Sequence, residues 1–504
     1  MLQLQGQSIL ILGLGASGMA MARWCARFGA QVRVADTRTD PPQLPVLQRE
    51  LPDVQFVGGA LTADLIEGTP IRAVFTSPGL SPEVTAPVLN AARANGLWVG
   101  GELSLFAQAL QDLQAERGYA PQVLAITGTN GKTTVTSWTG QLVARAGKTV
   151  QVAGNIGPTL LDTLALAIDH DLPEVWVLEL SSFQLEHAGA FEPTAATVLN
   201  LSQDHLDWHG SMAAYAQAKA RIFAQKALMV LNRDDAAVMA MLPEPVRVKL
   251  QKPLQRRHVT FGAGMPLRPG DFGIEMQNGM AWLVRALEAD ETSKLRKGEV
   301  EELHIQRLIP ADVLRIFGRH NAVNALAALA LACSAGCALA PILFGLREYR
   351  GEPHRVESVG VIHQVEYFDD SKGTNVGATV AALQGLGLDR RVVVILGGEG
   401  KGQDFAPLVQ PVSTYARAVV LIGQDAPAIR QHLQNTGVPL IDAHTMPDAV
   451  QKASAAAQAG DAVLLSPACA SFDMFQNYEH RAQVFCQAVA TLAEGAGVVL
   501  EALA

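Results

Sequence analysis

A glycine-flanked loop that carries a lysine and two threonines is the clearest chemical feature of the sequence. An apolar run at 123–127, suited to a buried strand, leads directly into Gly128, Thr129, Asn130, Gly131, Lys132, Thr133 and Thr134. In such loops glycine lets backbone N–H groups turn toward phosphates, lysine adds positive charge, and a threonine hydroxyl reaches Mg²⁺. The spacer between the two glycines is shorter than in the usual phosphate loop. We therefore predict a shortened variant of that loop, which binds a nucleotide triphosphate, rather than an ordinary turn.

Two later strands are expected to bring metal-binding groups to the same sheet edge. Glu179 lies near the end of the apolar segment 175–180, and Asp204, His205 and Asp207 follow the apolar segment 196–199. Carboxylates at the carboxyl ends of parallel strands, beside a phosphate loop, are suited to Mg²⁺, and histidine is a frequent metal ligand. Lys219, on a helix just downstream, is predicted from the residues alone to be a surface lysine.

The N-terminal hundred residues begin with a dinucleotide-binding fingerprint. Gly13, Gly15 and Gly18 follow a strand and open a helix, and Asp36 ends the next strand. Taken alone this pattern predicts NAD, although any nucleotide diphosphate suits such a helix N-terminus. Further polar groups follow the second strand and a later one. They are Thr37, Arg38, Ser77 and Gly79.

The last 150 residues place polar loops after several apolar strands. Arg355 is a natural phosphate clamp at the start of this region. The loops at 369–375, 397–402 and 466–473 are dense in polar residues, and the glycines of 397–402 offer backbone donors for a substrate carboxylate. Together they predict one pocket. Asn324 shares a helix face with Asn321, and capping explains only Asn321, so the pair is a candidate contact for a base or ribose.

These motifs are expected on three α/β domains. Strand and helix patterns alternate along the chain, which predicts parallel, doubly wound sheets. We expect an N-terminal Rossmann-like domain at 1–99, a central phosphate-loop ATPase-type domain at 100–350 and a C-terminal Rossmann-like domain at 351–504. The charged segment 287–308 is predicted to be a surface excursion, and the alanine-rich segment 322–346 a buried helix pair.

Composition favours a compact enzyme of the reducing cytoplasm. The chain has 504 residues, a net charge of −9 and 17% charged residues, so nucleic acid is a poor partner. Five scattered cysteines without a CxxC pair suit free thiols. The apolar segments 8–22 and 322–346 fit neither a signal peptide nor a membrane span, because glycines punctuate the first and alanine, Asn324 and Pro341 mark the second.

Taken together, the motifs resemble the Mur ligase family along essentially the whole chain. The phosphate loop, the Glu179 strand, Asp204–His205, the Asn324 helix, His354–Arg355 and Asp370–Lys372 occur in the family's order. Within the family, the motifs at 179–184, 370–375, 397–402 and 465–471 are most similar to members that add D-glutamate to UDP-N-acetylmuramoyl-L-alanine in peptidoglycan precursor synthesis. The segment 287–308 is longer than the family usually carries.

The resemblance implies an ATP-dependent amide synthesis through an acyl phosphate. Lys132, Thr133 and Glu179 would serve the phosphates and one Mg²⁺, and His205 would bind a second Mg²⁺. Lys219 matches the family's carbamylated lysine, which reverses the interpretation as a surface residue. The other ATP contacts implied are Asn324, Arg355 and Asp370, with Lys372 near the phosphates.

The resemblance also implies the substrate contacts. D-Glutamate would meet Thr374, Lys401, Ser471 and Tyr478, the last at a position where the family usually has Phe. The residues implied for the UDP-sugar substrate are Ser17, Thr37, Arg38, Ser77, Gly79 and Asn155. A monomer acting on small molecules is expected, and the C-terminal domain is expected to close on the central one and exclude water.

Three alternatives predict different behaviour. Another Mur ligase or a folylpolyglutamate synthase-like ligase would keep the fold and change the amino acid. An NAD-dependent dehydrogenase with an unrelated ATPase region would bind and reduce NAD. A nucleotide-binding switch would hydrolyse ATP slowly, whether or not a muramoyl nucleotide is present.

Overall fold

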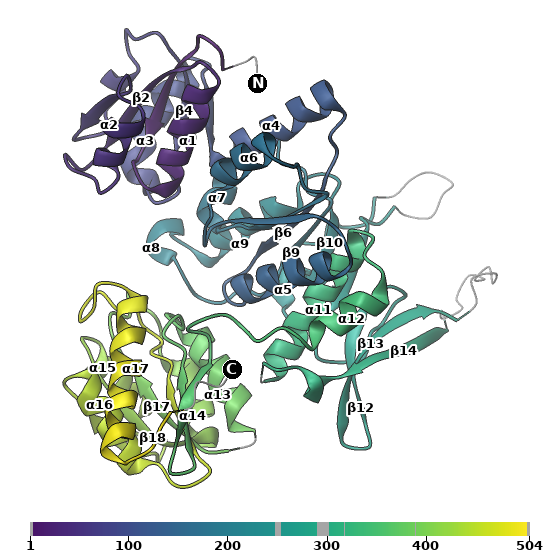
Figure 1. Ribbon diagram of the computed structural model, residues 1–504, viewed down its shortest axis with the longest axis vertical. Helices are drawn as coiled ribbons and strands as arrows, with labels where there is room; N and C mark the ends of the chain where they lie inside the picture. Colours follow the sequence, from purple (N-terminus) through teal and green to yellow (C-terminus); the bar gives the residue numbers. More distant parts are fainter. Residues whose placement is uncertain (1–3, 247–253, 290–301, 317, 389, 501–504) are drawn as a thin grey trace.

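The fold is described by a computed structural model over residues 4–246, 254–289, 302–316, 318–388 and 390–500 (Figure 1). It contains three parallel or mostly parallel sheets with helices packed on them, and a smaller antiparallel sheet. The α/β class predicted from the sequence is confirmed, and so are the alternating strands and helices. No helix in the described part of the chain combines the length and apolar character needed to cross a bilayer.

The N-terminal domain is a five-stranded parallel sheet in the order β3-β2-β1-β4-β5. Its order changes direction at β1. Of the predicted UDP-substrate residues, Ser17 lies in the first turn of α1, which follows β1, and Ser77 and Gly79 lie in the turn after β4. The strands and helices are β1 (Ser8–Leu12), α1 (Ala16–Arg27), β2 (Gln31–Asp36), α2 (Leu44–Glu50), β3 (Gln55–Gly58), β4 (Ile71–Thr76), α3 (Pro82–Ala94) and β5 (Trp98–Gly101).

The central domain is a six-stranded parallel sheet in the order β11-β10-β9-β6-β8-β7. Because β6 lies between β9 and β8, the loops that follow these three strands meet at one edge. The strands are β6 (Gln122–Thr127), β7 (Val150–Gly154), β8 (Val175–Glu179), β9 (Ala195–Val198), β10 (Leu228–Asn232) and β11 (His258–Phe261). The helices are α4 (Glu102–Arg117), α5 (Lys132–Arg145), α6 (Leu160–Asp169), α7 (Ser182–Glu186), α8 (Leu206–His209), α9 (Met212–Ala220), α10 (Ala236–Met239), α11 (Arg319–Ser334) and α12 (Leu339–Leu346).

The alanine-rich helix pair predicted at 322–346 is confirmed as α11 and α12. Small side chains let α11 pack closely against α5, and its residues 325–332 are buried. Trp138 of α5 stacks on Tyr349 just beyond α12, with ring centroids 4.7 Å apart. This packing places Asn324 beside the phosphate loop.

An antiparallel sheet extends from the central domain (Figure 1). It contains β12 (Phe272–Gln277), β13 (Met280–Glu288) and β14 (Leu303–Pro310), and its Phe272, Ile274 and Leu283 join the core that covers α5 and α11. The excursion predicted at 287–308 covers the end of β13 and most of β14, and its residues 290–301 lie outside the described residues.

The C-terminal domain is a six-stranded sheet in the order β15-β16-β20-β17-β18-β19, antiparallel only between β15 and β16. Its strands are β15 (Glu357–Ile362), β16 (Val365–Asp369), β17 (Val392–Leu396), β18 (Ala416–Leu421), β19 (Leu440–Asp442) and β20 (Ala462–Leu465). Its helices are α13 (Val376–Gly387), α14 (Val409–Tyr415), α15 (Ala426–Leu433), α16 (Met446–Ala456) and α17 (Tyr478–Gly495). The described part of the chain also contains short 3₁₀ turns at Ala63–Leu65, Arg221–Phe223, Ala311–Val313 and Ala406–Leu408.

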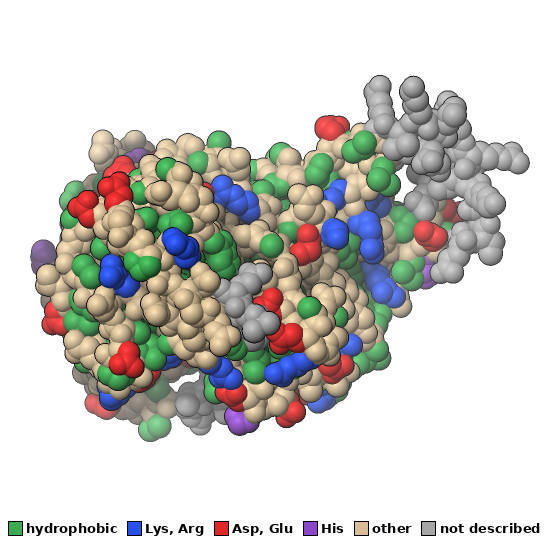
Figure 2. Space-filling view, turned by 90° about the horizontal axis from the view of Figure 1, so that it is seen from above, with side chains coloured by type: hydrophobic (Ala, Val, Ile, Leu, Met, Phe, Trp, Pro, Cys, Tyr) green, Lys and Arg blue, Asp and Glu red, His purple; other side chains and the backbone are tan. Residues whose placement is uncertain are grey.

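The domains are joined in two different ways. One apolar cluster runs from the N-terminal sheet through α1, α4 and α6 into the central sheet. Arg23 and Arg27 of α1 add ion pairs to Asp162 and Asp169 of α6. The C-terminal domain has apolar clusters of its own and meets the phosphate loop through polar side chains. On the face seen in Figure 2, acidic and basic side chains are interspersed.

Candidate active site

The phosphate loop runs from the end of β6 into the N-terminus of α5. Gly131, just before the helix, has φ +82°, a left-handed conformation that favours glycine. A Cβ atom there would lie 3.0 Å from Oδ1 of Asn324. The loop is held from the other side by Asn200, which accepts from the Asn130 N–H at 2.9 Å and donates to its carbonyl at 3.0 Å. The loop is therefore held on one side by Asn200, in the segment after β9, and packs on the other against Asn324 of α11.

Two lysine ammonium groups converge on one carbonyl of this loop. Lys132 Nζ donates to the carbonyl oxygens of Gly128 and Thr129, both at 2.9 Å. Lys219 Nζ donates to the same Gly128 oxygen at 2.9 Å and to Thr127 Oγ1 at 3.2 Å. Burial lowers the pKa of Lys132 and places the pKa of Lys219 well below its ordinary value, and the charge on Lys132 lowers that of Lys219 further.

The expectation from the residues alone that Lys219 lies at the surface is wrong. Its side chain is 1% exposed, and Nζ lies 4.7 Å from the centroid of the Tyr215 ring. The reason is helical spacing: Tyr215, Ala218 and Ile222 are buried, and they lie four, one and three positions from Lys219 on the inward face. That apolar spacing was the sequence pattern that could have indicated burial.

Glu179, at the end of β8, faces the loop with one oxygen available. Its Oε1 accepts from Asn155 Nδ2 at 2.9 Å, which fixes the carboxylate. Its Oε2 is buried and has no hydrogen-bond partner within the described ranges. An unpartnered buried carboxylate oxygen costs free energy unless a cation or donor completes it, so this position fits a metal ion.

The loop after β9 presents His205 in a left-handed conformation, with φ +53°. Its Nε2 lies 3.7 Å from Asp204 Oδ2, and its ring meets the edge of Phe183 at a centroid distance of 4.8 Å. Partial desolvation is the main cause that lowers the pKa of His205, although Asp204 opposes it. The neutral imidazole is the form that binds metal.

Lys132, Glu179 and His205 line a cavity of about 230 Å³ between the central and C-terminal domains, and Lys219 lies behind the phosphate loop, outside the lining. The predicted residues that it brings together are Thr129, Asn130, Lys132, Thr133, Asn155, Glu179, His205, Arg355, Lys372, Thr374 and Lys401. An adjoining cavity of about 550 Å³ is lined by others. Those are Asn130, Gly131, Thr134, Asn324, Arg355 and Asp370.

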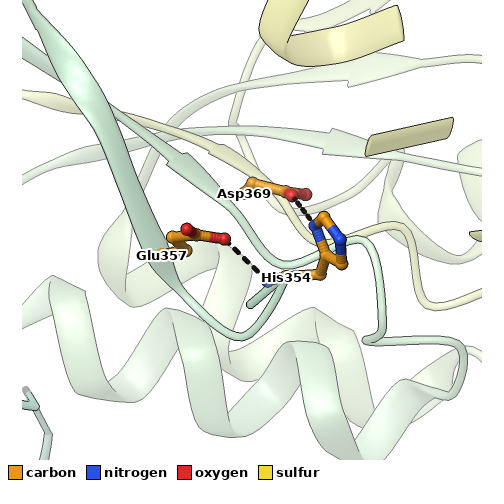
Figure 3. Close-up of side chains that lie close together, drawn as sticks. All are labelled: His354, Glu357 and Asp369. Atoms are coloured by element: carbon orange, nitrogen blue, oxygen red, sulfur yellow. Dashed lines mark hydrogen bonds and ion pairs between the residues drawn. The ribbon is translucent and has the colours of Figure 1, made fainter. Parts of the chain in front are cut away.

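Arg355 lines both cavities, and hydrogen bonds of the neighbouring His354 fix the linker that carries it. His354 Nδ1 lies 2.7 Å from Asp369 Oδ2, and the His354 N–H donates to Glu357 Oε2 at 2.8 Å (Figure 3). Arg355 then points to the central domain, where Nη2 donates to Thr133 Oγ1 at 2.8 Å. Hydrogen bonds that orient Arg355 thus explain why His354, Glu357 and Asp369 lie close together.

Asp370 is a buried carboxyl group directly after β16, the strand that ends at Asp369. It is 6% exposed, and its Oδ2 accepts from Ser466 Oγ at 2.6 Å. Burial raises the pKa of Asp370 to about 7, against the opposing effects of Ser466 and Arg355. A carboxyl group that titrates near neutrality can donate or accept a hydrogen bond toward a hydroxyl ligand.

Three backbone N–H groups of the glycine loop at 397–402, where donors for a substrate carboxylate were predicted, are engaged within the domain. The N–H groups of Gly397, Glu399 and Gly400 donate to Pro467 O, Ala470 O and Asp425 Oδ2 at 2.6–3.0 Å. A Cβ at Gly398 would lie 2.2 Å from the Ala470 oxygen. These glycines let two loops pack together, and the cation of Lys401 remains to face the cavity.

Ser471 and Tyr478 line neither of the two cavities formed by the described residues. Ser471 is buried, at 3% exposure, in the loop that pairs with the glycine loop. Tyr478 opens α17, with its ring centroid 5.0 Å from Lys372 Nζ. Tyr478 therefore contacts a residue of the site, and Ser471 belongs to the loop that supports it.

The N-terminal fingerprint is glycine-rich for steric reasons. A Cβ at Gly18 would lie 1.9 Å from the Gly13 oxygen. Asp36, the residue expected to bind a ribose, accepts from the Leu14 N–H at 2.7 Å and from the Arg38 N–H and guanidinium. These donors outweigh its burial and lower the pKa of Asp36 to about 2. Its carboxylate is engaged within the domain, which removes the main support for NAD. Thr37 and Arg38 are exposed beside it.

Two residues of the site were missed in the sequence. Arg481 is 2% exposed and donates to the carbonyl oxygens of Ser371 at 2.8 Å and Cys469 at 3.1 Å, which joins two polar loops. Its spacing from the buried Ala482 and Phe485 could have indicated an inward position. Asn375 bonds across to the central domain, and nothing in its sequence context distinguishes that contact from helix capping.

Comparison with known proteins places the chain in a family. The Mur ligase MurD-like N-terminal domain matches residues 7–101, the Mur ligase middle domain residues 126–332, and the Mur ligase glutamate ligase domain residues 354–469. The chain belongs to the Mur ligase family.

Several relatives are similar over their full length. Proteins named UDP-N-acetylmuramoylalanine–D-glutamate ligase are 70% identical in Albidiferax ferrireducens, with 99% of each chain covered, and 57% identical in Burkholderia pseudomallei, with 98% and 99% covered. Among solved structures, the UDP-N-acetylmuramate-alanine ligase of Thermotoga maritima has a TM-score of 0.54 at 19% identity, with 96% and 99% covered. The MurF ligase of Thermotoga maritima in complex with ADP has a TM-score of 0.56 at 15% identity, with 97% and 96% covered. These two structures confirm the fold.

The raised pKa of Asp370 predicts a pH dependence of stability. Between pH 3.8 and about 7 the folded chain holds a proton that the unfolded chain has released. The contribution of Asp370 to stability is therefore complete below pH 3.8 and is lost as the pH rises to about 7. Its slope approaches roughly 1.4 kcal/mol per pH unit at most. Denaturant unfolding across this range should show a flatter profile for Asp370→Asn than for the exposed control Asp404→Asn. Identical slopes in both variants would contradict the assignment.

Proposed function

We propose that the chain is an ATP-dependent ligase that joins D-glutamate to UDP-N-acetylmuramoyl-L-alanine in peptidoglycan precursor synthesis. The observation that carries the proposal is the 230 Å³ cavity, where Lys132 and Thr133 of the phosphate loop face Lys372, Thr374 and Lys401 of the C-terminal domain. A phosphorylated intermediate formed on one side thus meets an amine held on the other. The names and high identity of the relatives support this choice of substrates.

The proposed reaction has two steps. The substrate carboxylate attacks the γ-phosphate of ATP, giving an acyl phosphate and ADP. The amine of D-glutamate then attacks the acyl carbon, the C–O bond to phosphate breaks, and the amine loses a proton as the amide forms. The first step brings anions together, so Lys132, Arg355 and Lys372 stabilise it by balancing negative charge in a cavity with little water.

The residues also fit two Mg²⁺ ions. Thr133 and the unpartnered Oε2 of Glu179 would hold one, and His205 with a modified Lys219 the other. Bound there, the ions neutralise charge on the transferring phosphoryl group. Asn155 orients the Glu179 carboxylate toward the first position.

Carbamylation of Lys219 follows from its environment. A lysine whose pKa is well below its ordinary value loses its proton more readily, which makes the neutral, nucleophilic amine more accessible. The nitrogen forms a bond to the carbon of CO₂, a proton leaves to solvent, and a carboxylate replaces an ammonium group. The replacement removes the repulsion with Lys132 and supplies an oxygen ligand for Mg²⁺.

Other site residues are assigned in the same proposal. The wider 550 Å³ cavity suits the nucleoside of ATP, with Asn324 at the base, Asp370 at the ribose and Arg355 at the phosphates. D-Glutamate is assigned to Thr374, Lys401, Ser471 and Tyr478. The UDP-sugar part is assigned to Ser17, Thr37, Arg38, Ser77, Gly79 and Asn155.

We further propose that a single chain carries the whole site, with domain boundaries at 99/100 and 350/351. The first position lies inside β5, which ends at Gly101 directly before α4, and the linker that carries His354 and Arg355 supports the second position. The reducing cytoplasm is the proposed compartment, supported by five free cysteines.

The first test is phosphate release from ATP with UDP-N-acetylmuramoyl-L-alanine and a panel of amino acids. We expect release only when the muramoyl nucleotide and D-glutamate are both present, with amide product appearing in equal amount. Strict dependence on another amino acid would retain the ligase chemistry and overturn the substrate. Release independent of both substrates would overturn the ligase assignment.

Lys132→Ala should lower turnover by roughly 100-fold or more, because the ammonium group that meets the transferring phosphate is lost. Binding of UDP-N-acetylmuramoyl-L-alanine, measured by calorimetry, should stay within about twofold, since that substrate is assigned mainly to the N-terminal domain. Lys226→Ala, an exposed lysine of the same domain, is the matched control. Loss of substrate binding in Lys132→Ala alone would contradict the assignment of the domains.

Lys219→Ala should be inactive and should regain part of its turnover in the presence of acetate. The added carboxylate can take the place of the carbamate in the small space left by the lysine side chain. Turnover is measured across an acetate series at constant ionic strength, with Lys226→Ala as the control that acetate should not stimulate. Full activity of Lys219→Ala without acetate would rule out the carbamate.

A further inference from the structure

The side chain of Asn375 bridges the C-terminal and central domains. It is 5% exposed and caps α13, where Oδ1 accepts from the Ala378 N–H at 2.9 Å. The same amide pairs with Asn130 of the phosphate loop in both directions, with N···O distances of 3.1 and 3.3 Å. Its Nδ2 also lies 3.4 Å from Asp204 Oδ2. One amide thus contacts a helix of its own domain and two loops of the other.

The backbone beside Asn375 packs closely against the central domain. A Cβ at Gly377 would lie 2.9 Å from Ser202 Oγ and 3.1 Å from Asn130 Nδ2, so a larger residue there would force these two side chains to shift. Asn130 has a fixed position, because its backbone exchanges two hydrogen bonds with the Asn200 side chain. The contact therefore joins two preorganised elements.

The bridge lies next to the residues assigned to the amino acid. Lys372 and Thr374 precede Asn375 in the same loop, and both line the cavity that contains Lys132. On the other side, the Val376 N–H donates to Gln403 Oε1 at 3.1 Å, which connects α13 to the segment after Lys401. A shift of Asn375 relative to Asn130 would move this side of the cavity against the phosphate loop.

We propose that Asn375 is a positioning residue that, through its amide pair with Asn130, keeps the amino-acid side of the cavity aligned with the phosphate loop. The inference rests on the proposed ligase reaction. The acyl phosphate has two possible fates: attack by the amine gives the amide and phosphate, and attack by water returns the carboxylate and releases phosphate. Alignment across the bridge favours the amine, because small displacements of a bound nucleophile slow its attack strongly.

Asn375→Ser is the decisive variant. The serine hydroxyl can still cap α13, but its side chain is too short to reach Asn130 and Asp204. We expect the KM for D-glutamate to rise roughly tenfold, and phosphate released per amide formed to exceed one, because a misaligned amine loses to water. The Kd of a non-hydrolysable ATP analogue should stay within about twofold. Wild-type KM with one phosphate per amide would overturn the proposal.

Two further variants separate positioning from stability. Thr445→Ala removes the N-cap of α16 in the same domain, away from both cavities, so it should lower the thermal midpoint while keeping one phosphate per amide. Asn375→Asp keeps the size and the cap of the side chain, but it cannot donate to Asn130 and adds a charge near Asp204. It should also release excess phosphate, and normal coupling in this variant would count against the bridge.

A readout independent of activity distinguishes this inference from the proposed function. Small-angle scattering with the ATP analogue should give a larger maximum dimension for Asn375→Ser than for wild type or Thr445→Ala, because the C-terminal domain loses a contact. Unchanged dimensions would overturn the bridge even if the ligase reaction is correct. If wild type forms no amide with D-glutamate, the proposed function fails, while a larger dimension in the variant would still support the domain contact.

Discussion

The convergence of two lysines on one carbonyl oxygen is the constraint on which the site depends. Lys132 and Lys219 each place Nζ 2.9 Å from the Gly128 oxygen. Burial lowers the pKa of both lysines, and the charge on Lys132 lowers the pKa of Lys219 further. Under the proposed function, phosphates beside Lys132 and a carbamate on Lys219 would turn mutual repulsion into attraction, so one geometry would serve both nucleotide binding and modification of the lysine.

The topology explains how these groups meet and why one side of the site can move. Adjacent strands β8, β6 and β9 end at one edge, which brings Glu179, the phosphate loop and His205 together on a rigid sheet. The N-terminal and central domains share an apolar cluster, whereas the C-terminal domain meets the phosphate loop through Arg355 and Asn375. Polar contacts of this kind are more easily exchanged for water than an apolar cluster is, so we expect any opening of the site to occur on the C-terminal side.

The sequence predicted the parts of the fold that depend on local pattern. The apolar segments 123–127, 175–180 and 196–199 located β6, β8 and β9 to within one residue at each end, and the alanine-rich pair was expected where α11 and α12 lie. Other features depend on distant partners. The glycine loop was predicted to offer backbone donors to a ligand, but the N–H groups of Gly397 and Glu399 bond to a loop about 70 residues away, near Ala470. The burial of Lys219 could be predicted only from the helical spacing of the buried Tyr215 and Ile222. The contact of Asn375 with the central domain could be predicted only from the placement of two domains.

The N-terminal fingerprint shows the same limit of sequence-based prediction, in this case for the identity of the ligand. Its glycines are explained by a close approach between Gly13 and Gly18, which is a property of the turn rather than of NAD. The acid expected at a ribose is engaged with Leu14 N–H and with Arg38. A sequence fingerprint therefore defines the course of the backbone, and this turn with its helix N-terminus suits a diphosphate of any nucleotide. The residues proposed for the UDP-substrate outside the fingerprint are the exposed Thr37 and the turn with Ser77 and Gly79, where a choice between nucleotides would be made.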